Sequence, residues 1–410
     1  MAIQIPSQKP LVVRLVDSEE AFHALKDRWN ELSDASVYPN IFSTWQWCSI
    51  WWKWYGEKEL HGKLFLVLIE SDDQLVGLFP LYLSTKGISG INRTRTLHFI
   101  GYGARPSGEY WGPIIRKDWV EPVCDAALDF FHKPKADWDS FFFESYALDD
   151  PGTVAFTQKM KVAFPSYSQE DEERFYITFS GTYDDYLKTL SGHNRSKKKN
   201  RYNQAIKKNG ATFCTMELDT IDKWFPVMKD LLKESRRRLN QVSPYETDKY
   251  CDFQIELLNA LLPLQHADVS LLNYEGHPVA VTYSFLYCGK CFFYQPGYAS
   301  NIQGSPGDVS LQMLLMKMID LGCTEFDFLR GGEWYKSQYT DVGRKTEMLV
   351  LFPKRNKSYF LTLFAHYFYK PLRRSAKRIL LLLFEFFNKK EAQELRERKS
   401  SDDSQEKVEV

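Results

Sequence analysis

The 410-residue chain has little cysteine, no net charge and no long apolar run. Its seven cysteines are odd in number and scattered, so we expect no disulfide framework and a reducing cytoplasm. Lysine plus arginine equals aspartate plus glutamate, so no global field attracts nucleic acid. No stretch reaches the roughly 18 unbroken apolar residues of a membrane span. The N-terminus lacks the basic and apolar regions of a secretory signal, so a cytoplasmic chain is expected.

Several catalytic signatures are also missing. The eight histidines show no paired ligand spacing, and the CxxC at 288–291 has no second pair, so we expect no metal. We interpret this CxxC as a hairpin turn, because a redox motif would open a helix. Neither G-x-S-x-G nor a P-loop sequence occurs, which argues against serine hydrolases and P-loop ATPases.

A repeated pattern is present instead. Residues 64–83 read as two strands around a Ser-Asp-Asp-Gln turn, and residues 268–298 read as three strands with Glu-Gly and Cys-Gly-Lys turns. Val76-Gly77-Leu78 aligns with Val279-Ala280-Val281 at an offset of 203 residues (279 − 76). A helix-like segment precedes each passage, at 44–56 and at 249–262. The pattern predicts an internal duplication of an α+β domain.

The loop QGSPGD, residues 303–308, lies between a predicted strand and an amphipathic helix. Gly304 and Gly307 allow backbone N–H groups to turn outward, and Asp308 or Ser310 can cap the helix. A helix N-terminus with free N–H groups binds phosphate or pyrophosphate. The other interpretation is an ordinary Pro-Gly turn.

A basic helix is predicted at 193–210, where seven positive charges fall within fourteen residues from Arg195 to Lys208 without an acid. Because like charges repel, a purely structural role is costly. The segment can bind nucleic acid, dock an anionic cofactor or substrate, or form a solvated face. The balanced net charge and the lack of a nucleic-acid motif argue against DNA.

Two further segments carry polar or aromatic side chains. In the Gly-rich loop 101–115, Glu109, Tyr110 and Trp111 can form a wall for a sugar or another polar acceptor, or Tyr110 and Trp111 can be core. Residues 326–341 read FDFLRGGEWYKSQYTD, in which a short strand leads into two glycines and a polar cluster. The cluster can form the floor of an acceptor site, or a polar network that holds the Gly-Gly loop.

The C-terminal part is amphipathic. Residues 358–390 predict two helices around Pro371 with an apolar face and basic flanks. Such helices lie on anionic lipid, or pack on the protein's own core or a second subunit. The highly charged residues 391–410 are expected to be disordered.

The chain resembles the CelD-type, Fem-related branch of the GNAT acyltransferase superfamily, whose members accompany bacterial cellulose and exopolysaccharide genes. The residues that carry the resemblance are spread over most of the chain, at 42–56, 75–83, 99–103, 194–210, 276–298, 305–307 and 327–341. The last segment is the most specific, with Asp-x-x-Arg-Gly, then Tyr-Lys, then Thr-Asp. Two positions depart from the family: Tyr339 stands where Trp is frequent, and Glu109-Tyr110 stands where Asp-Tyr is frequent.

The resemblance implies an α+β fold of tandem GNAT-like domains with mixed central sheets and added C-terminal helices. We place the N-terminal domain at 1–172, the acyl-CoA-binding domain at 173–356, the amphipathic helices at 357–390 and the tail at 391–410. The implied activity is transfer of an acyl group, from acetyl-CoA or another acyl-CoA, to an amine of an amino sugar or polysaccharide intermediate. Peripheral contact with the inner face of the cytoplasmic membrane through 370–390 would fit that setting.

The resemblance also implies residue roles. The pantetheine of the donor runs along a splayed strand and its pyrophosphate sits on the next helix N-terminus, which assigns cofactor binding to Tyr294, Gln295, Ser305, Pro306, Gly307 and Asp308. We expect the catalytic groups among Glu333, Asp341, Tyr335 and Asp327. Expected substrate contacts are Arg330, Lys336, Glu109, Tyr110 and Arg195.

Two other functions remain open at this point. A Fem-like aminoacyltransferase would use aminoacyl-tRNA and bind RNA through the basic helix, with loss of binding in moderate salt. A non-catalytic module would retain the fold and scaffold a membrane polysaccharide synthase. The intact Ser-Pro-Gly loop and the Tyr-Lys cluster argue against the second of these.

Overall fold

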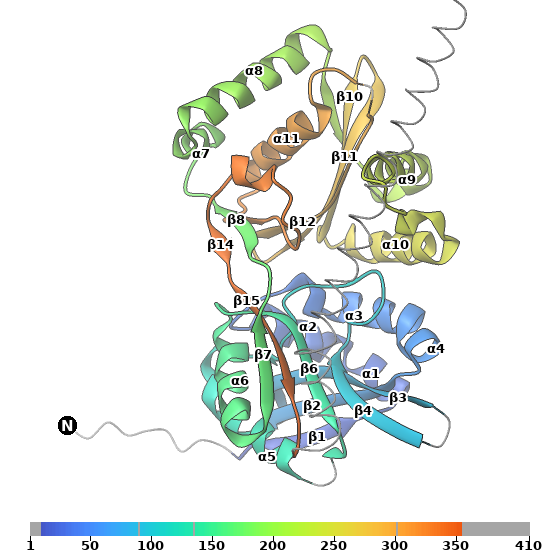
Figure 1. Cartoon of the computed structure of the whole chain (residues 1–410), viewed down its shortest axis with the longest axis vertical. Coiled ribbons are helices and arrows are strands. Elements are labelled where there is room, and N and C mark those ends of the chain that lie inside the picture. The colour runs from blue at the N-terminus through green and yellow to red at the C-terminus, as the bar shows by residue number, and fades with distance from the viewer. Residues whose placement is uncertain (1–9, 89–90, 134–135, 301, 355–410) are drawn as a thin grey trace, which may run out of the picture. The chain divides into compact units, whose positions relative to one another are not determined.

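Two mixed β-sheets, each with helices on both faces, make up the described part of the chain (Figure 1). The computed structural model describes residues 10–88, 91–133, 136–300 and 302–354. The predicted helices at 357–390 and the predicted disordered tail at 391–410 lie outside the described residues. Within them, no helix combines the length and the apolar character that crossing a membrane requires.

The first sheet has eight strands among the described residues, in the order β1-β2-β3-β4-β6-β15-β7, with β5 paired to β3. Their bounds are β1 Val12–Val16, β2 Lys63–Ser71, β3 Gln74–Ile88, β4 Ile91–Phe99, β5 Ile114–Ile115, β6 Ser140–Ala147, β7 Ser166–Glu170 and β15 Thr346–Leu351. Neighbours are antiparallel except β4 and β6, which pair in parallel from Thr96 to His98. We call this sheet and its helices the first lobe.

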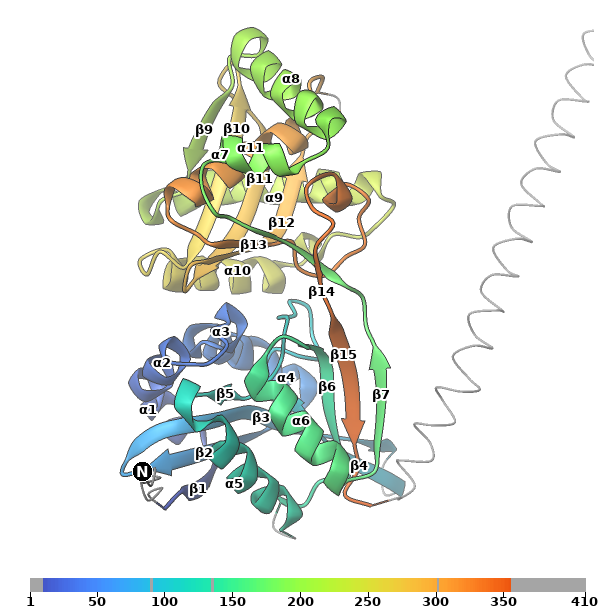
Figure 2. The same ribbon diagram turned by 90° about the vertical axis from the view of Figure 1, so that its left-hand side faces the viewer.

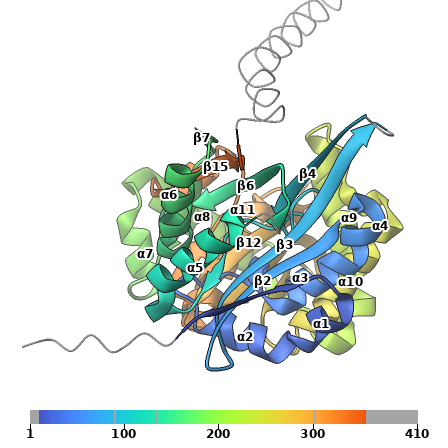
Figure 3. The same cartoon turned by 90° about the horizontal axis from the view of Figure 1, so that it is seen from below.

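Helices cover both faces of the first sheet (Figure 3). One group is α1 Glu19–Ala24, α2 Lys26–Asp34, α3 Trp45–Trp51 and α4 Glu57–Leu60; the other is α5 Val120–His132 and α6 Pro151–Ala163. Phe79, Phe131, Phe143 and Phe156 form part of the core between the sheet and the second group. Because successive side chains of a strand point to opposite faces, a continuous apolar run such as residues 64–69 of β2 produces two buried faces.

The second lobe repeats this arrangement. Its seven strands among the described residues have the order β14-β8-β13-β12-β11-β10-β9. Their bounds are β8 Arg174–Thr178, β9 Thr212–Thr215, β10 Ala267–Tyr274, β11 His277–Tyr287, β12 Lys290–Tyr298, β13 Glu325–Asp327 and β14 Gly343–Arg344. The helices are α7 Tyr183–Thr189, α8 Gly192–Lys208, α9 Ile221–Arg238, α10 Asp248–Leu261 and α11 Pro306–Asp320. In Figure 1, α9 and α10 lie on one side of β12, and α7, α8 and α11 lie on the other.

The predicted duplication is confirmed down to strand register. In the first lobe Ile69 pairs with Gly77, and in the second Leu272 pairs with Ala280, each 203 residues further on (272 − 69, 280 − 77). Both hairpins have a bulge directly after this pair. Each lobe also contains one parallel strand pair, β4 with β6 and β12 with β13. The two halves are therefore copies of one supersecondary unit.

The chain crosses between the lobes twice at the same place. β7 belongs to the first sheet and β8 to the second, and the chain returns from β14 to β15. Figure 2 shows β15 between β6 and β7. Strand β15 lies within the stretch predicted for the second domain, yet it completes the first sheet. At the crossing, Arg174 and Arg344 pair in register, and both are buried.

An apolar core joins the two lobes. Phe42 of the first lobe has its ring centroid 5.8 Å from both Phe285 and Phe292 of the second. Trp47 lies 6.0 Å from Phe253 in an edge-to-face arrangement, so α3 packs against α10. Because aromatic side chains bury a large apolar area per residue, this contact stabilises the packing of the two lobes against each other.

Candidate active site

The site begins where two parallel strands separate. β12 pairs with β13 only from Lys290 to Phe292. β13 then ends at Asp327, while β12 continues beside β11 to Tyr298. The separation opens a cavity of about 290 Å³, which we call the first cavity. Its lining comes from α8, β12, α11 and the loop after β13, namely Arg201, Phe293, Pro296, Tyr298, Ser305, Gly307, Asp308, Leu311, Trp334, Tyr335, Gln338 and Tyr339.

The N-terminus of α11 opens into this cavity. Ser305 has a left-handed backbone (φ 56°) and Pro306 is the first helical residue. At Gly307 an added Cβ would lie 3.0 Å from Cδ1 of Tyr298, so only a residue without a side chain lets the helix approach the ring freely. The N–H groups of Asp308 and Val309 donate to the Ser305 carbonyl at 3.0 and 3.1 Å, so the Gly307 N–H is the first-turn donor with no backbone acceptor among the described residues, and it favours an anion. Ser305 and Gly307 thus line the first cavity, and phosphate binding by them stays a prediction; the buried Pro306 has no N–H to donate and only starts the helix.

Asp308 has a different role from the predicted one. Tyr339 donates to its Oδ1 at 2.7 Å, and Gln312 donates to its Oδ2 at 2.9 Å. Lys198 and Arg201 each form an ion pair with it at 3.3 Å. Burial alone would raise the pKa of Asp308, but Lys198 and these other partners hold it below its ordinary value. The carboxylate thus fixes the cations of α8 and does not itself bind a phosphate.

One side of the basic helix α8 faces α11 and the first cavity. The Lys198 ammonium is buried and lies 3.0 Å from the ring centroid of Tyr339. Burial lowers its pKa to about 8, against the attraction of Asp308. Lys197 donates to Gln338, a residue of the cavity wall, at 3.4 Å. Arg195, predicted to contact substrate, is half-buried and does not line the first cavity.

Two residues predicted to bind the cofactor face away from the first cavity. The register of β11 and β12 shifts between Tyr283 and Ser284, which places a bulge at Tyr294. Phe293 and Pro296 line the first cavity, whereas Tyr294 and Gln295 line a second cavity on the opposite face of β12. A bulge re-aims side chains and interrupts the ladder locally. β12 is therefore a wall shared by two cavities.

The loop after β13 is built around Lys336. Its buried ammonium donates to the carbonyl oxygens of four successive residues, Phe328, Leu329, Arg330 and Gly331, at 2.8 to 3.1 Å. Glu333 forms an ion pair with it at 2.9 Å. Lys336 thus holds the Gly-Gly loop, which is the structural alternative, and its contacts leave no donor for the predicted grip on an anionic substrate.

The predicted catalytic residues of this region are separated. Tyr335 lines the first cavity, and burial raises its pKa well above the ordinary value, so the phenol stays protonated. Glu333 is about half exposed and pairs with Lys336, and Asp341 is exposed; neither lines the first cavity. Trp334 is 75% exposed and lines the cavity. The structure therefore brings only Tyr335 of the four to the cavity wall.

Asp327 is buried between the lobes. Tyr110 donates to its Oδ2 at 2.7 Å, Arg344 forms an ion pair with the same oxygen, and the Leu329 N–H donates to Oδ1 at 2.7 Å. Burial raises the pKa of Asp327, with Arg344 opposing. Both carboxylate oxygens have partners and Asp327 is 0% exposed. These contacts fit a structural role better than the predicted catalytic role. Tyr110 likewise forms part of the core.

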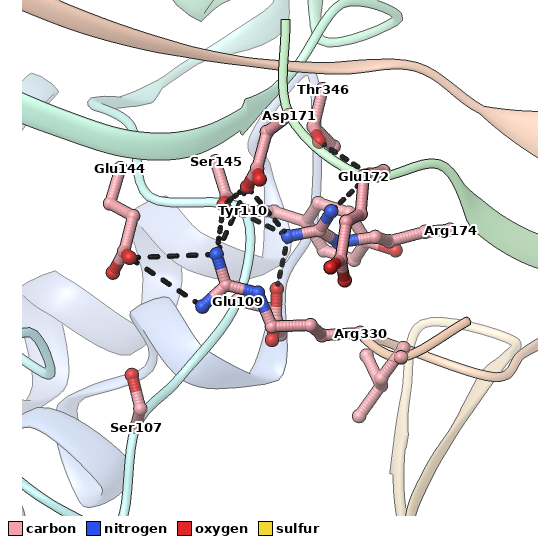
Figure 4. Close-up of polar contacts among 12 residues, drawn as sticks. Ser107, Glu109, Tyr110, Glu144, Ser145, Asp171, Glu172, Arg174, Arg330 and Thr346 are labelled. Carbon is pink, nitrogen blue, oxygen red and sulfur yellow. Dashed lines mark hydrogen bonds and ion pairs between the residues drawn. The ribbon is translucent and has the colours of Figure 1, made fainter. Parts of the chain in front are cut away.

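A second polar cluster lies next to this pair (Figure 4). Arg174 donates to Ser145 at 2.9 Å and forms ion pairs with Glu109 at 3.3 Å and Asp171 at 3.1 Å. Arg330 contacts the same Ser145 and Asp171, each at 3.0 Å. Burial raises the pKa of Glu109 to about 7, against the attraction of Arg174. Glu109 and Arg330, both predicted to bind substrate, therefore belong to one network that joins the lobes.

Sequence reasoning missed several members of these networks. Arg174, Arg344 and Asp171 lie near the lobe boundary, in segments that had no motif to single them out. Glu144 and Ser145 were included only as part of a strand. Trp334 was within the quoted segment 326–341, and an exposed tryptophan beside a Gly-Gly loop was the one signal that could have identified it.

Residues 194–337 match a family model described as "Acetyltransferase (GNAT) domain". No curated protein matches the chain. A solved structure described as "Crystal structure of FemX" is 9% identical with a TM-score of 0.56, covering 79% of this chain and 95% of that chain. A conserved protein of unknown function from Bacteroides thetaiotaomicron VPI-5482 is 10% identical with a TM-score of 0.50, covering 83% and 100%. These likenesses concern the fold, and the segment that matches the GNAT-domain model lies in the second lobe.

Proposed function

We propose that the protein is an N-acyltransferase that moves an acyl group from acyl-CoA to an amine. The carrying observation is the first cavity, which lies at the separation of β12 and β13 and has the N-terminus of α11 at one end. The matching GNAT domain spans all of these elements. An apolar channel beside an anion-binding helix end fits a long pantetheine arm with a pyrophosphate.

The cavity offers contacts for each part of such a donor. The Gly307 N–H at the N-terminus of α11 and the guanidinium of Arg201 suit the phosphates. Phe293, Pro296 and Leu311 provide apolar contacts for the pantetheine arm. Acyl-CoA supplies the acyl group as a thioester, and the reaction breaks its C–S bond and forms a C–N bond to the amine.

Residues of this chain would stabilise the negative charge that develops in the reaction and supply a proton to the leaving group. Backbone N–H groups at the β12 bulge are suited to stabilise negative charge on the acyl oxygen. Tyr335 is protonated and can donate to the departing sulfur. None of the described residues that line the second cavity, on the other face of β12, is a carboxylate. We therefore infer that the acceptor amine loses its proton to water, so that one proton leaves nitrogen and one reaches sulfur.

The resemblance to CelD-type proteins favours an amino sugar of polysaccharide or cell-envelope biosynthesis as acceptor, with membrane contact through 370–390. A Fem-like, tRNA-dependent aminoacyl transfer is the second candidate. The observation that favours it is the exposed basic face of α8, which includes Lys199, Lys207 and Lys208. A non-catalytic scaffold is disfavoured by a first cavity that retains an open helix N-terminus.

Calorimetric titration with acetyl-CoA tests the proposal. We expect micromolar binding to the wild type and its loss in Ser305→Glu, which puts a carboxylate at the helix N-terminus. Ser305→Asn is the matched control, because asparagine tolerates the left-handed backbone and adds no charge. If neither acetyl-CoA nor a longer acyl-CoA binds the wild type, the proposal is wrong, and the tRNA-dependent and scaffold functions remain.

A further inference from the structure

The second cavity measures about 620 Å³ and lies across β12 from the first. Tyr294 and Gln295 of β12 form its floor, and both face it because of the bulge. Its rim comes from both lobes. Arg105 and Ser107 belong to the loop between β4 and β5, and Arg236 belongs to the end of α9.

The charged side chains that line this cavity are all positive. Arg105 and Arg236 line it, and its lining in the described part of the chain includes no aspartate or glutamate. Among the described residues, neither arginine forms an ion pair, and Arg236 donates only to the neutral Gln241, at 2.8 Å. The neighbouring Arg237 and Lys233 both pair with Glu246, at 3.4 and 2.7 Å. Two uncompensated guanidinium groups in one concave site attract an anion more strongly than isolated surface charges do.

The groups around the arginines are held in place. The loop that carries Arg105 is anchored where the Trp51 indole donates to the Pro106 carbonyl at 2.9 Å. The Gln295 amide is oriented by Tyr245, which donates to its oxygen at 2.7 Å, and by Tyr250, which accepts from its nitrogen at 2.8 Å. Preorganised groups lose little entropy when a ligand binds. The cavity is thus a fixed polar site rather than a gap between mobile side chains.

We infer that the acceptor amine carries an anionic group, a phosphate or a carboxylate, and that Arg105 and Arg236 bind it in the second cavity. This inference rests on the proposed function, because it uses β12 as the wall between donor and acceptor. The anion at the arginines would hold the acceptor, and its amine would face the bulge at Tyr294. Bidentate contact by guanidinium groups suits both phosphate and carboxylate.

The test uses three amine probes on the full chain, namely D-glucosamine, D-glucosamine 6-phosphate and D-glucosaminic acid. CoA at saturating concentration first occupies the first cavity, and each probe is then titrated by calorimetry. We expect the two anionic probes, or one of them, to bind at least about tenfold more tightly than glucosamine. The probe that binds decides between phosphate and carboxylate.

Arg105→Ala and Arg236→Ala should each abolish the difference in affinity between the anionic probes and glucosamine. Arg237→Ala should retain this difference, because Arg237 does not line the cavity. The inference is overturned if no anionic probe binds at millimolar concentration, if glucosamine binds equally well, or if Arg237→Ala loses as much as Arg236→Ala. CoA binding separates the two failures. If CoA binds and the anionic probes do not, only this inference falls; if CoA does not bind, the proposed function falls.

Discussion

The phenolic oxygen of Tyr110 lies 2.7 Å from Oδ2 of Asp327, and this hydrogen bond joins the two lobes. Both residues are buried. Arg344 of β14 forms an ion pair with the same carboxylate. Three separate chain segments therefore meet at Asp327. The lobes therefore depend on each other for stability.

Tyr110→Phe should lower the free energy of unfolding by about 1 to 3 kcal/mol, because a buried acceptor loses a donor. Tyr38→Phe is the control, since its bond to Asp149 is exposed and longer, at 3.2 Å. Urea unfolding followed by tryptophan fluorescence and by circular dichroism measures the effect. Nine of the eleven tryptophans precede residue 140 and report on the first lobe. Different midpoints for the two signals would contradict lobes that unfold together.

Glu109 should give the protein a pH-dependent stability. The folded pKa is about 7, above the ordinary value of 4.5, so the folded chain keeps a proton that the unfolded chain releases. The contribution of Glu109 to the free energy of unfolding is therefore fully present below pH 4.5. It falls by roughly 3 kcal/mol as the pH rises to about 7. Glu109→Gln should lack this decline. Parallel pH curves for the two proteins, from urea unfolding at each pH, would show that burial does not hold the proton.

Lys336→Met should disturb the loop after β13 rather than the charge of the cavity. Four carbonyl oxygens lose one shared donor, so we expect a loss of about 3 kcal/mol or more in the free energy of unfolding. Lys345→Met removes an exposed lysine nearby and should cost little. If the Lys336 variant is as stable as the control but binds an anionic ligand more weakly, the predicted substrate contact is correct after all.

Arg201→Ala should weaken acetyl-CoA binding about tenfold, since it removes a guanidinium from the first cavity. Lys207→Ala is the matched control, because Lys207 lies on the exposed part of the same helix. Calorimetry over a range of salt concentrations measures both. If acetyl-CoA binding is unchanged while both variants weaken RNA binding to a similar extent, α8 acts as a nucleic-acid helix.

Much of the fold was predictable because its signals are local. The strand patterns of both hairpins and the Asp72-Asp73 and Glu275-Gly276 turns are each set by a few adjacent residues. These turn residues all have positive φ, as short hairpins require. The CxxC at 288–291 turns a hairpin as expected, between β11 and β12. β7 and β15 were missed, because no local sequence pattern indicates which of the two sheets such a short strand joins.

The candidate site was predictable only in part, for the same reason. Ser305 and Gly307 were identified because a loop before a helix is a local pattern. Whether a carboxylate is free depends on distant partners: Asp308 pairs with Lys198 and Arg201 of α8, and Asp327 accepts from Tyr110. The side of β12 that Tyr294 and Gln295 face depends on a bulge that the sequence does not mark. Roles that rest on contacts across 100 residues or more could not be read from spacing.

The contact between α3 and α10 carries a trace of how the chain arose. Lys53 and Glu256 occupy matching positions of the two copies (256 − 53 = 203), and the ammonium lies 2.8 Å from the carboxylate. In a symmetric dimer of two identical chains, a residue on the twofold axis meets itself and would repel a like charge. Here the two copies place opposite charges at matching positions, so the duplication is no longer symmetric at this contact. Two N-terminal copies paired in this way would face Lys53 with Lys53, so at this position each half complements the other half rather than itself.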